Sequence, residues 1–176
     1  MSKLWEKESK VDKKIEEFTV GNDYILDQEL IRYDCLGSIA HCRMLGKIGI
    51  LNEKETEKTI GILEEIIDKG TLDILPNQED CHTAIENYLT QKLGDIGEKI
   101  HTARSRNDQI LTALRLYYLD KIDDCRNFVE GFTGALKKLS LKYGDTPLPG
   151  YTHMRKAMPS SLSLWCQAFI ESSEDN

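Results

Sequence analysis

The stretch from about Arg106 to Tyr143 constrains most strongly what this chain can fold into. Apolar residues recur there at spacings of three and four over roughly ten helical turns, with no proline. A helix of this length, roughly 50 Å at 1.5 Å per residue, needs neighbours along its whole extent. We therefore expect an all-α fold built on a long helical bundle shared between subunits, with no sheet larger than a short hairpin.

The rest of the sequence also has helical spacing and is divided by only four prolines, at positions 76, 147, 149 and 159. One helix is expected over residues 26–48, where Gly37 permits close packing or a bend. Asn52 and Glu55 have the spacing of a capping box for the next helix, and Gly70 is expected to end it. A shorter helix follows.

The last helical pattern begins near Leu162, after a turn that is rich in proline. We expect a small helical amino-terminal domain over residues 1–105, followed by the first part of a central bundle domain over residues 106–176. Because the bundle is barely begun when the sequence stops, we interpret the chain as truncated.

Composition excludes several classes of protein. The formal net charge is -7 and no basic run exceeds two residues, so nucleic-acid binding is not expected. The five cysteines lie far apart without a CxxC pair, which predicts reduced thiols rather than a disulfide framework. No apolar run has the length of a signal peptide or a membrane span, so we expect a soluble cytoplasmic protein without membrane partners.

A polar string, ARSRND, marks the start of the long helix. Ser105 and Asp108 have capping-box spacing, which places Ser105 at the N-cap. The first-turn N–H groups, the helix dipole and Arg104 or Arg106 would then converge with Asn107 on a volume that favours a carboxylate or a phosphate. The simpler alternative is that Ser105 only caps the helix and that the arginines pair with neighbouring acids or are solvated.

Two further polar strings carry candidate chemistry. PLPGYTHMRKAMP places Thr152 and His153 side by side in a loop stiffened by prolines, which suits general acid–base catalysis. The alternative is a histidine that only hydrogen-bonds the loop or stays exposed. NQEDCHTAIE places Asp80 before a helix, where it can simply be a cap. Metal binding is not expected, because the neighbouring side chains of Cys81 and His82 should diverge on a helix.

Together these strings resemble the argininosuccinate lyase family of the fumarase and aspartase superfamily. The landmarks are KLW near the start, DCLGSIAH at 34–41, GIL at 49–51, EDCHTAIE at 79–86, GEKIHTARSRNDQ at 97–109 and LPGYTHMRKAMP at 148–159. The resemblance therefore covers nearly the whole chain. The S-R-N-D and G-Y-T-H strings are the discriminating ones, because the sister enzymes, such as fumarase and adenylosuccinate lyase, have different polar strings at both places.

The resemblance implies a carbon–nitrogen lyase that cleaves argininosuccinate reversibly to arginine and fumarate, in arginine biosynthesis and without a cofactor. It also implies a homotetramer in which several chains build each active site. Family chains are more than twice as long and carry a second proton-transfer residue, a serine, on a later loop. We therefore expect this chain to be inactive by itself.

The resemblance also assigns roles to residues. His153 takes part in proton transfer, and the substrate-binding residues are Ser105, Arg106, Asn107, Thr152, Asp80 and Asp23. The departures from the family pattern are Asp23 for a frequent serine, Ala103 for a frequent glycine, and Met154, Arg155 and Met158 in a string that usually contains two glutamines. These changes leave the reaction class intact and alter only fine contacts.

Two other functions stay open from the sequence. A truncated or repurposed lyase would act as a non-catalytic structural or assembly protein, as the lens crystallins of this family do. Another lyase of the superfamily would release fumarate from a different substrate.

Overall fold

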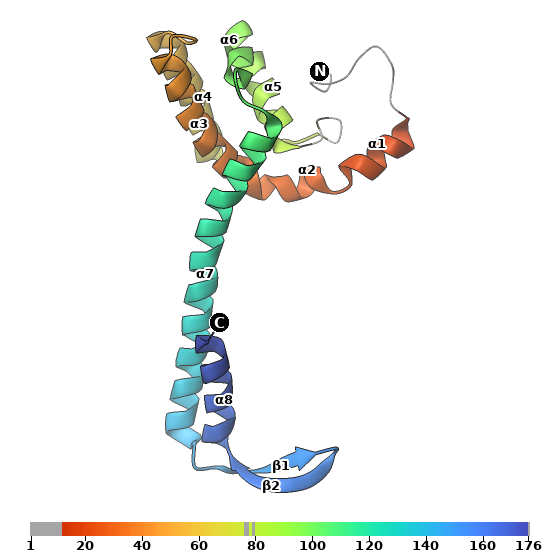
Figure 1. Ribbon diagram of the computed structural model, residues 1–176, viewed down its shortest axis with the longest axis vertical. Coiled ribbons are helices and arrows are strands. Elements are labelled where there is room, and N and C mark those ends of the chain that lie inside the picture. The colour runs from red at the N-terminus through yellow and green to blue at the C-terminus, as the bar shows by residue number, and fades with distance from the viewer. Residues whose placement is uncertain (1–11, 76–77, 79, 176) are drawn as a thin grey trace. The chain divides into compact units, whose positions relative to one another are not determined.

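The computed structural model describes residues 12–75, 78 and 80–175, so the KLW landmark lies outside the described residues. The chain divides into two compact units, Met1–Tyr118 and Leu119–Asn176. The division falls inside the long helix α7 (Arg106–Tyr143), whose bounds are those predicted from the sequence (Figure 1). The domain boundary expected between residues 105 and 106 stays a prediction.

The regular secondary structure in the described part of the first unit is all helical. Its elements are α1 (Lys13–Val20), α2 (Asp23–Leu26), η1 (Asp27–Leu30), α3 (Ile31–Lys47), α4 (Glu53–Lys69), α5 (Cys81–Leu93), α6 (Asp95–Glu98), η3 (Lys99–His101) and the first part of α7. The helix expected to start near residue 26 is therefore a short 3₁₀ turn followed by α3. The all-α fold class is confirmed.

Helices α3, α4 and α5 contribute most residues of the first unit's core. Figure 1 shows α3 and α4 side by side. The core residues include Ile31, Ile39, Leu63, Ile66, Ile85 and Leu89. Gly37 is a point of close packing, because a Cβ built there would lie 3.2 Å from Cγ2 of Thr112 on α7. Among the described helices, none is both long and apolar enough to cross a membrane.

Local signals define α4 as the sequence predicts. The Asn52 side chain accepts from the Glu55 amide at 2.9 Å, and the Asn52 amide donates to the Glu55 carboxylate at 2.8 Å, which completes the capping box. Gly70 ends the helix in the left-handed conformation, with φ 69°.

The second unit consists of the rest of α7, the hairpin β1 (Pro147–Thr152) and β2 (Arg155–Ser161), and α8 (Leu162–Glu174). Leu136 of α7 packs against Cys166 and Ile170 of α8. The stretch expected as a proline-stiffened loop is instead an antiparallel hairpin in which Pro149 lies opposite Pro159. Both strands are edge strands, which tolerate a residue that cannot donate a backbone hydrogen bond.

A buried polar contact joins α3 to α5. Nδ1 of His82 lies 2.9 Å from Oδ2 of Asp34, and both side chains are about 2% exposed. Burial by itself lowers the pKa of His82, but the hydrogen bond to Asp34 and the nearby carboxylates of Asp80 and Asp27 outweigh it and raise that pKa. The charged form of the histidine is therefore favoured beside the carboxylate.

This contact predicts a strong loss of stability in His82→Leu. The substitution leaves the Asp34 carboxylate buried without its cationic partner, which costs about 3 kcal/mol of unfolding free energy. Because the folded pKa of His82 lies above the unfolded value of about 6.5, the pair contributes fully below pH 6.5. The contribution is lost as the pH rises through the folded pKa.

Urea unfolding at pH 6.5 and pH 9 measures this effect. The difference in unfolding free energy between wild type and His82→Leu should be smaller at the higher pH. The double variant Asp34→Asn, His82→Gln removes both charges and should recover most of the loss. A difference in unfolding free energy that increases with pH would contradict the proposal that His82 is charged beside Asp34.

Ala103 provides a second test, because its φ of 56° lies in the left-handed region. That conformation costs an L-residue about 1 kcal/mol, so Ala103→Gly should raise the unfolding free energy by about 0.5 kcal/mol after the entropic cost of glycine. The matched control is Ala40→Gly, an exposed position inside α3, which should lower it by about 1 kcal/mol. Equal destabilisation by both changes would show that residue 103 is not strained.

Candidate functional site

The start of α7 is closed by the capping box that the sequence predicts. The Ser105 amide donates to Oδ2 of Asp108 at 2.8 Å, and the Asp108 amide points back to Oγ of Ser105 at 3.4 Å. Hydrogen bonds from the Ser105 backbone and side chain to the carboxylate lower the pKa of Asp108. The Ser105 and Asn107 side chains are both exposed at this helix end.

Arg104 ties the helix start to α3. Its Nη1 donates to Oγ of Ser38 at 3.0 Å, and Ser38 donates to Oδ1 of Asp34 at 3.3 Å. Burial lowers the pKa of Arg104, while the charges of Asp34, Glu86 and Asp108 oppose that shift and keep the guanidinium charged. Arg104 is thus bound inside the first unit.

Arg106 ties the same helix start to α5. Its Nη1 lies 3.2 Å from Oδ2 of Asp80, and its Nη2 donates to Oγ1 of Thr83. The other oxygen of Asp80 caps α5 by accepting from the Thr83 amide at 2.8 Å. The structure therefore brings together two predicted site residues, Asp80 and Arg106. Their predicted contacts to substrate stay predictions, as does that of Asp23, which is exposed at the start of α2.

A small pocket of about 290 Å³ lies beside the helix start within the first unit. Its lining residues are Asp34, Gly37, His41, Met44, Ala103, Arg104, Asp108, Gln109 and Thr112. Nε2 of His41 donates to the Thr102 carbonyl at 3.0 Å. Burial, with the nearby charge of Arg104, lowers the pKa of His41. The neutral ring is therefore favoured, and it fixes the backbone just before Ala103.

Thr152 and His153 lie at the tip of the hairpin in the second unit, and both are exposed. His153 and Met154 form the turn, with φ values of 47° and 62°. Paired left-handed residues suit a two-residue hairpin turn, whose twist matches that of the flanking strands. The two predicted parts of the site, Asn107 and His153, thus lie in different units.

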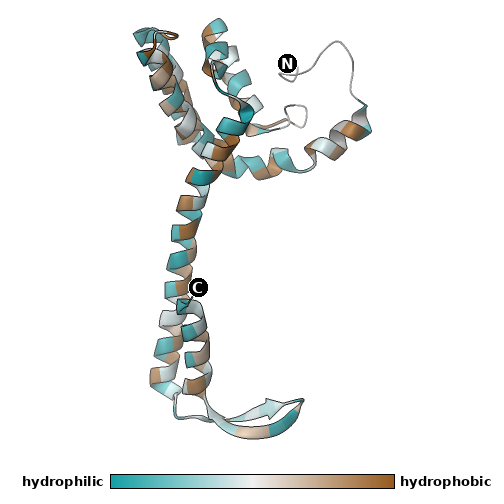
Figure 2. Cartoon of the chain, viewed as in Figure 1, coloured by the Kyte–Doolittle hydropathy of each residue, from teal (hydrophilic) through white to brown (hydrophobic). Residues whose placement is uncertain are grey.

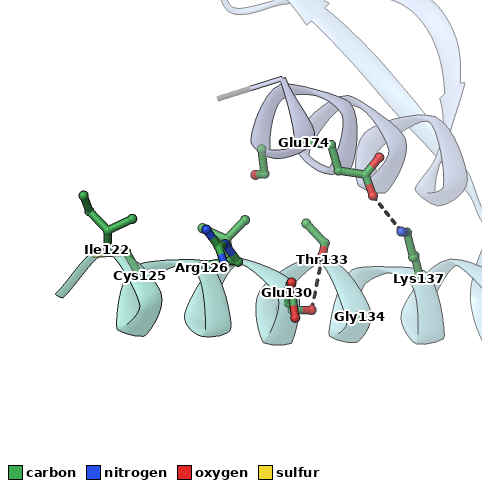
Figure 3. Close-up of a pocket in the computed structure, with 10 residues that line it drawn as sticks. Ile122, Cys125, Arg126, Glu130, Thr133, Gly134, Lys137 and Glu174 are labelled. Atoms are coloured by element: carbon green, nitrogen blue, oxygen red, sulfur yellow. Dashed lines mark hydrogen bonds and ion pairs between the residues drawn. The ribbon is translucent and has the colours of Figure 1, made fainter. Parts of the chain in front are cut away.

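A larger open groove of about 800 Å³ lies between α7 and α8 in the second unit (Figure 3). Lys137 and Glu174 form an ion pair of 2.7 Å across it, and Oγ1 of Thr133 donates to the Glu130 carbonyl. None of the predicted site residues lines this groove. It is therefore not the candidate site.

Cys81, His82 and Asp34 form a cluster that the sequence argument did not anticipate. Sγ of Cys81 lies 3.8 Å from Nδ1 of His82, and the three potential ligand atoms lie within 4.8 Å of one another. The expectation that these neighbouring side chains diverge is therefore wrong. Burial, together with the charge of Asp34, raises the pKa of the Cys81 thiol, which disfavours the thiolate that a metal would need.

Sequence reasoning missed Ser38 and Thr83, the partners of the two arginines. The spacing of Asp34 and Ser38 by four residues is a signal for a hydrogen bond along one helix face. Thr83 has no comparable signal, because its partner Arg106 lies 23 residues away.

Known proteins that are similar to this chain include lyases. The model of a family described as Lyase matches residues 2–176. Argininosuccinate lyase of Thermotoga neapolitana is 45% identical over 99% of this chain and 44% of that protein. The enzyme of the same name from Parabacteroides distasonis is 44% identical over 99% of this chain and 40% of that protein. The chain thus spans about two fifths of the length of these curated relatives.

Solved structures show the same fold at lower identity. A fumarate lyase:delta crystallin from Brucella melitensis has a TM-score of 0.72 and 18% identity, over 93% of this chain and 43% of that chain. A variant of EDDS lyase with bound fumarate has a TM-score of 0.69 and 24% identity, over 95% of this chain and 33% of that chain. Since the family model extends over residues 2–176, the chain belongs to the lyase family.

Proposed function

We propose that this chain contributes to an argininosuccinate lyase, which eliminates arginine from argininosuccinate to give fumarate, in arginine biosynthesis. The observation that carries the proposal is the start of α7, where the exposed residues Ser105 and Asn107 alternate with two internally paired arginines. The names of the relatives support the same reaction. The proposed location is the cytoplasm.

The start of α7 suits the carboxylate that lies next to the reacting carbon. Removal of a proton from that carbon places negative charge on the carboxylate, and the positive end of the helix dipole favours negative charge. The Asn107 amide and the Ser105 hydroxyl are neutral donors beside them. Groups fixed in this way stabilise the developing charge more than the ground state.

The elimination also needs two proton transfers. One group must take the proton from carbon, and another must protonate the guanidinium nitrogen as the carbon–nitrogen bond breaks. We assign His153 to proton transfer and Thr152 to substrate binding at the hairpin tip. Asp23 is proposed to face the guanidinium group of the substrate. The second transfer group is proposed to come from outside residues 1–176.

Exposed apolar side chains support the proposal that the second unit belongs to a larger bundle in a homotetramer. Figure 2 shows hydrophobic residues recurring along α7 and α8. The exposed ones include Ile122, Phe128, Phe132 and Leu139 on α7 and Leu164, Trp165 and Phe169 on α8. Faces of this kind are usually covered by other helices or other chains.

The proposal predicts that residues 1–176 by themselves release little or no fumarate from argininosuccinate. Mixing them with a polypeptide that supplies the remaining length of the Thermotoga neapolitana relative should restore activity. His153→Asn should then lower the rate by about 10²- to 10⁴-fold, because a positioned proton-transfer group is lost. Fumarate release is followed by ultraviolet absorbance.

Lys156→Gln serves as the matched control, because it changes an exposed side chain on the same hairpin without touching the imidazole. It should leave the rate of the mixture unchanged. Ample activity of residues 1–176 alone would show that the proton carriers are misassigned. A mixture that folds and associates but releases fumarate only from adenylosuccinate would point to a different lyase of the superfamily.

A further inference from the structure

The amino-terminal ends of α5 and α7 are joined by one pair of charged side chains. Asp80 caps α5 with one carboxylate oxygen and approaches Arg106 with the other, at 3.2 Å. Arg106 is the first residue of α7, so the contact connects the two helix starts directly.

The burial of this contact distinguishes it from an ordinary surface ion pair. The Asp80 side chain is 16% exposed and that of Arg106 is 29% exposed, while Thr83, the second partner of the guanidinium, is 1% exposed. Two nitrogens of the guanidinium thus engage two fixed acceptors at the same helix end. A planar fork held at two points fixes orientation as well as distance.

Arg106 lies between Ser105 and Asn107 in the sequence. Holding its side chain against α5 therefore fixes the backbone that presents both neighbours to solvent. From this arrangement we infer that Arg106 and Asp80 are positioning residues, which orient Ser105 and Asn107 and do not contact the substrate. The inference rests on the proposed function for its catalytic consequence, but the holding of the helix start can be measured without it.

Asp80→Asn separates the two possible roles of Arg106. Asparagine caps a helix about as well as aspartate, so the variant keeps the start of α5 and removes only the charge that holds Arg106. A guanidinium that binds substrate would be released by this change and would keep or gain affinity for a carboxylate. A positioning pair would lose function when either member is changed.

The first experiment measures hydrogen exchange in the 176-residue chain. The amides of Ser105, Asp108 and Gln109 report on the start of α7, because each donates a hydrogen bond there. Asp80→Asn and Arg106→Gln should each accelerate their exchange by roughly five- to tenfold, as expected for loss of a hydrogen-bonded charged partner. The double variant should exchange no faster than either single variant, and Arg106→Lys should recover part of the protection.

The core amides of Leu63 and Ile66 on α4 should keep their wild-type rates in all these variants. Glu65→Gln is the matched control, because it removes the carboxylate of an exposed ion pair with Lys69 in the same unit. It should leave the α7 amides unchanged. Additive effects in the double variant, or equal acceleration of the α4 amides, would overturn the positioning role.

The second experiment measures fumarate release by the mixture described above. Asp80→Asn and Arg106→Gln should lower kcat by similar factors, with the double variant no slower than either single variant. If Arg106→Gln lowers kcat while Asp80→Asn keeps full activity, Arg106 is a substrate ligand and the inference is overturned. If the wild-type mixture releases no fumarate, the proposed function fails, and the exchange experiment still decides whether the pair holds the helix start.

Discussion

The contact between the Asp34 carboxylate and the His82 imidazole is the interaction on which the first unit depends. It joins α3 to α5 in the buried interior of the unit, where an unpaired charge would be costly. The second carboxylate oxygen of Asp34 accepts a hydrogen bond from the Ser38 hydroxyl. That hydroxyl in turn accepts a hydrogen bond from Arg104, in the segment before α7. Three segments that are distant in sequence therefore share one network of charges and hydroxyls.

This network explains why the start of α7 is polar yet presents few free charges. Arg104 donates a hydrogen bond to Ser38 of α3, and Arg106 forms an ion pair with Asp80 at the start of α5. The exposed groups there include the Ser105 hydroxyl and the Asn107 amide, beside the capping carboxylate of Asp108. Such a site stabilises charge through fixed dipoles, which do not have to reorganise when charge develops. Internal pairing of the arginines is thus compatible with anion binding by their neighbours.

Features encoded over a few residues were predictable from the sequence. The capping boxes at Asn52 and Ser105 and the bounds of α7 depend on spacings of three and four, which the chain displays directly. The partner of Arg106 was not predictable, because its distance in sequence gives no local signal. The hairpin at Pro149 was missed since prolines usually indicate a loop, and only the pairing of two edge strands accommodates them.

Backbone strain marks both predicted parts of the site. Among the described residues, the non-glycine residues with positive φ are Ala103, His153 and Met154. Ala103 lies just before the α7 capping box, and the other two form the hairpin tip. Each such conformation costs of order 1 kcal/mol and persists only where surrounding contacts require it. At Ala103 those contacts are visible, because His41 donates to the carbonyl of the preceding residue, Thr102, and Ser38 accepts from the side chain of the following residue, Arg104.

The hairpin tip lacks comparable support within its own unit. His153 and Met154 are exposed, and a two-stranded hairpin by itself is only weakly stable in water. A strained turn on a weakly stable element gains a fixed geometry only when other groups pack against it. The same proposed assembly that covers the apolar faces of α7 and α8 would provide those groups. The proposed catalytic placement of His153 and the burial of the exposed apolar faces are therefore one requirement of that proposed assembly.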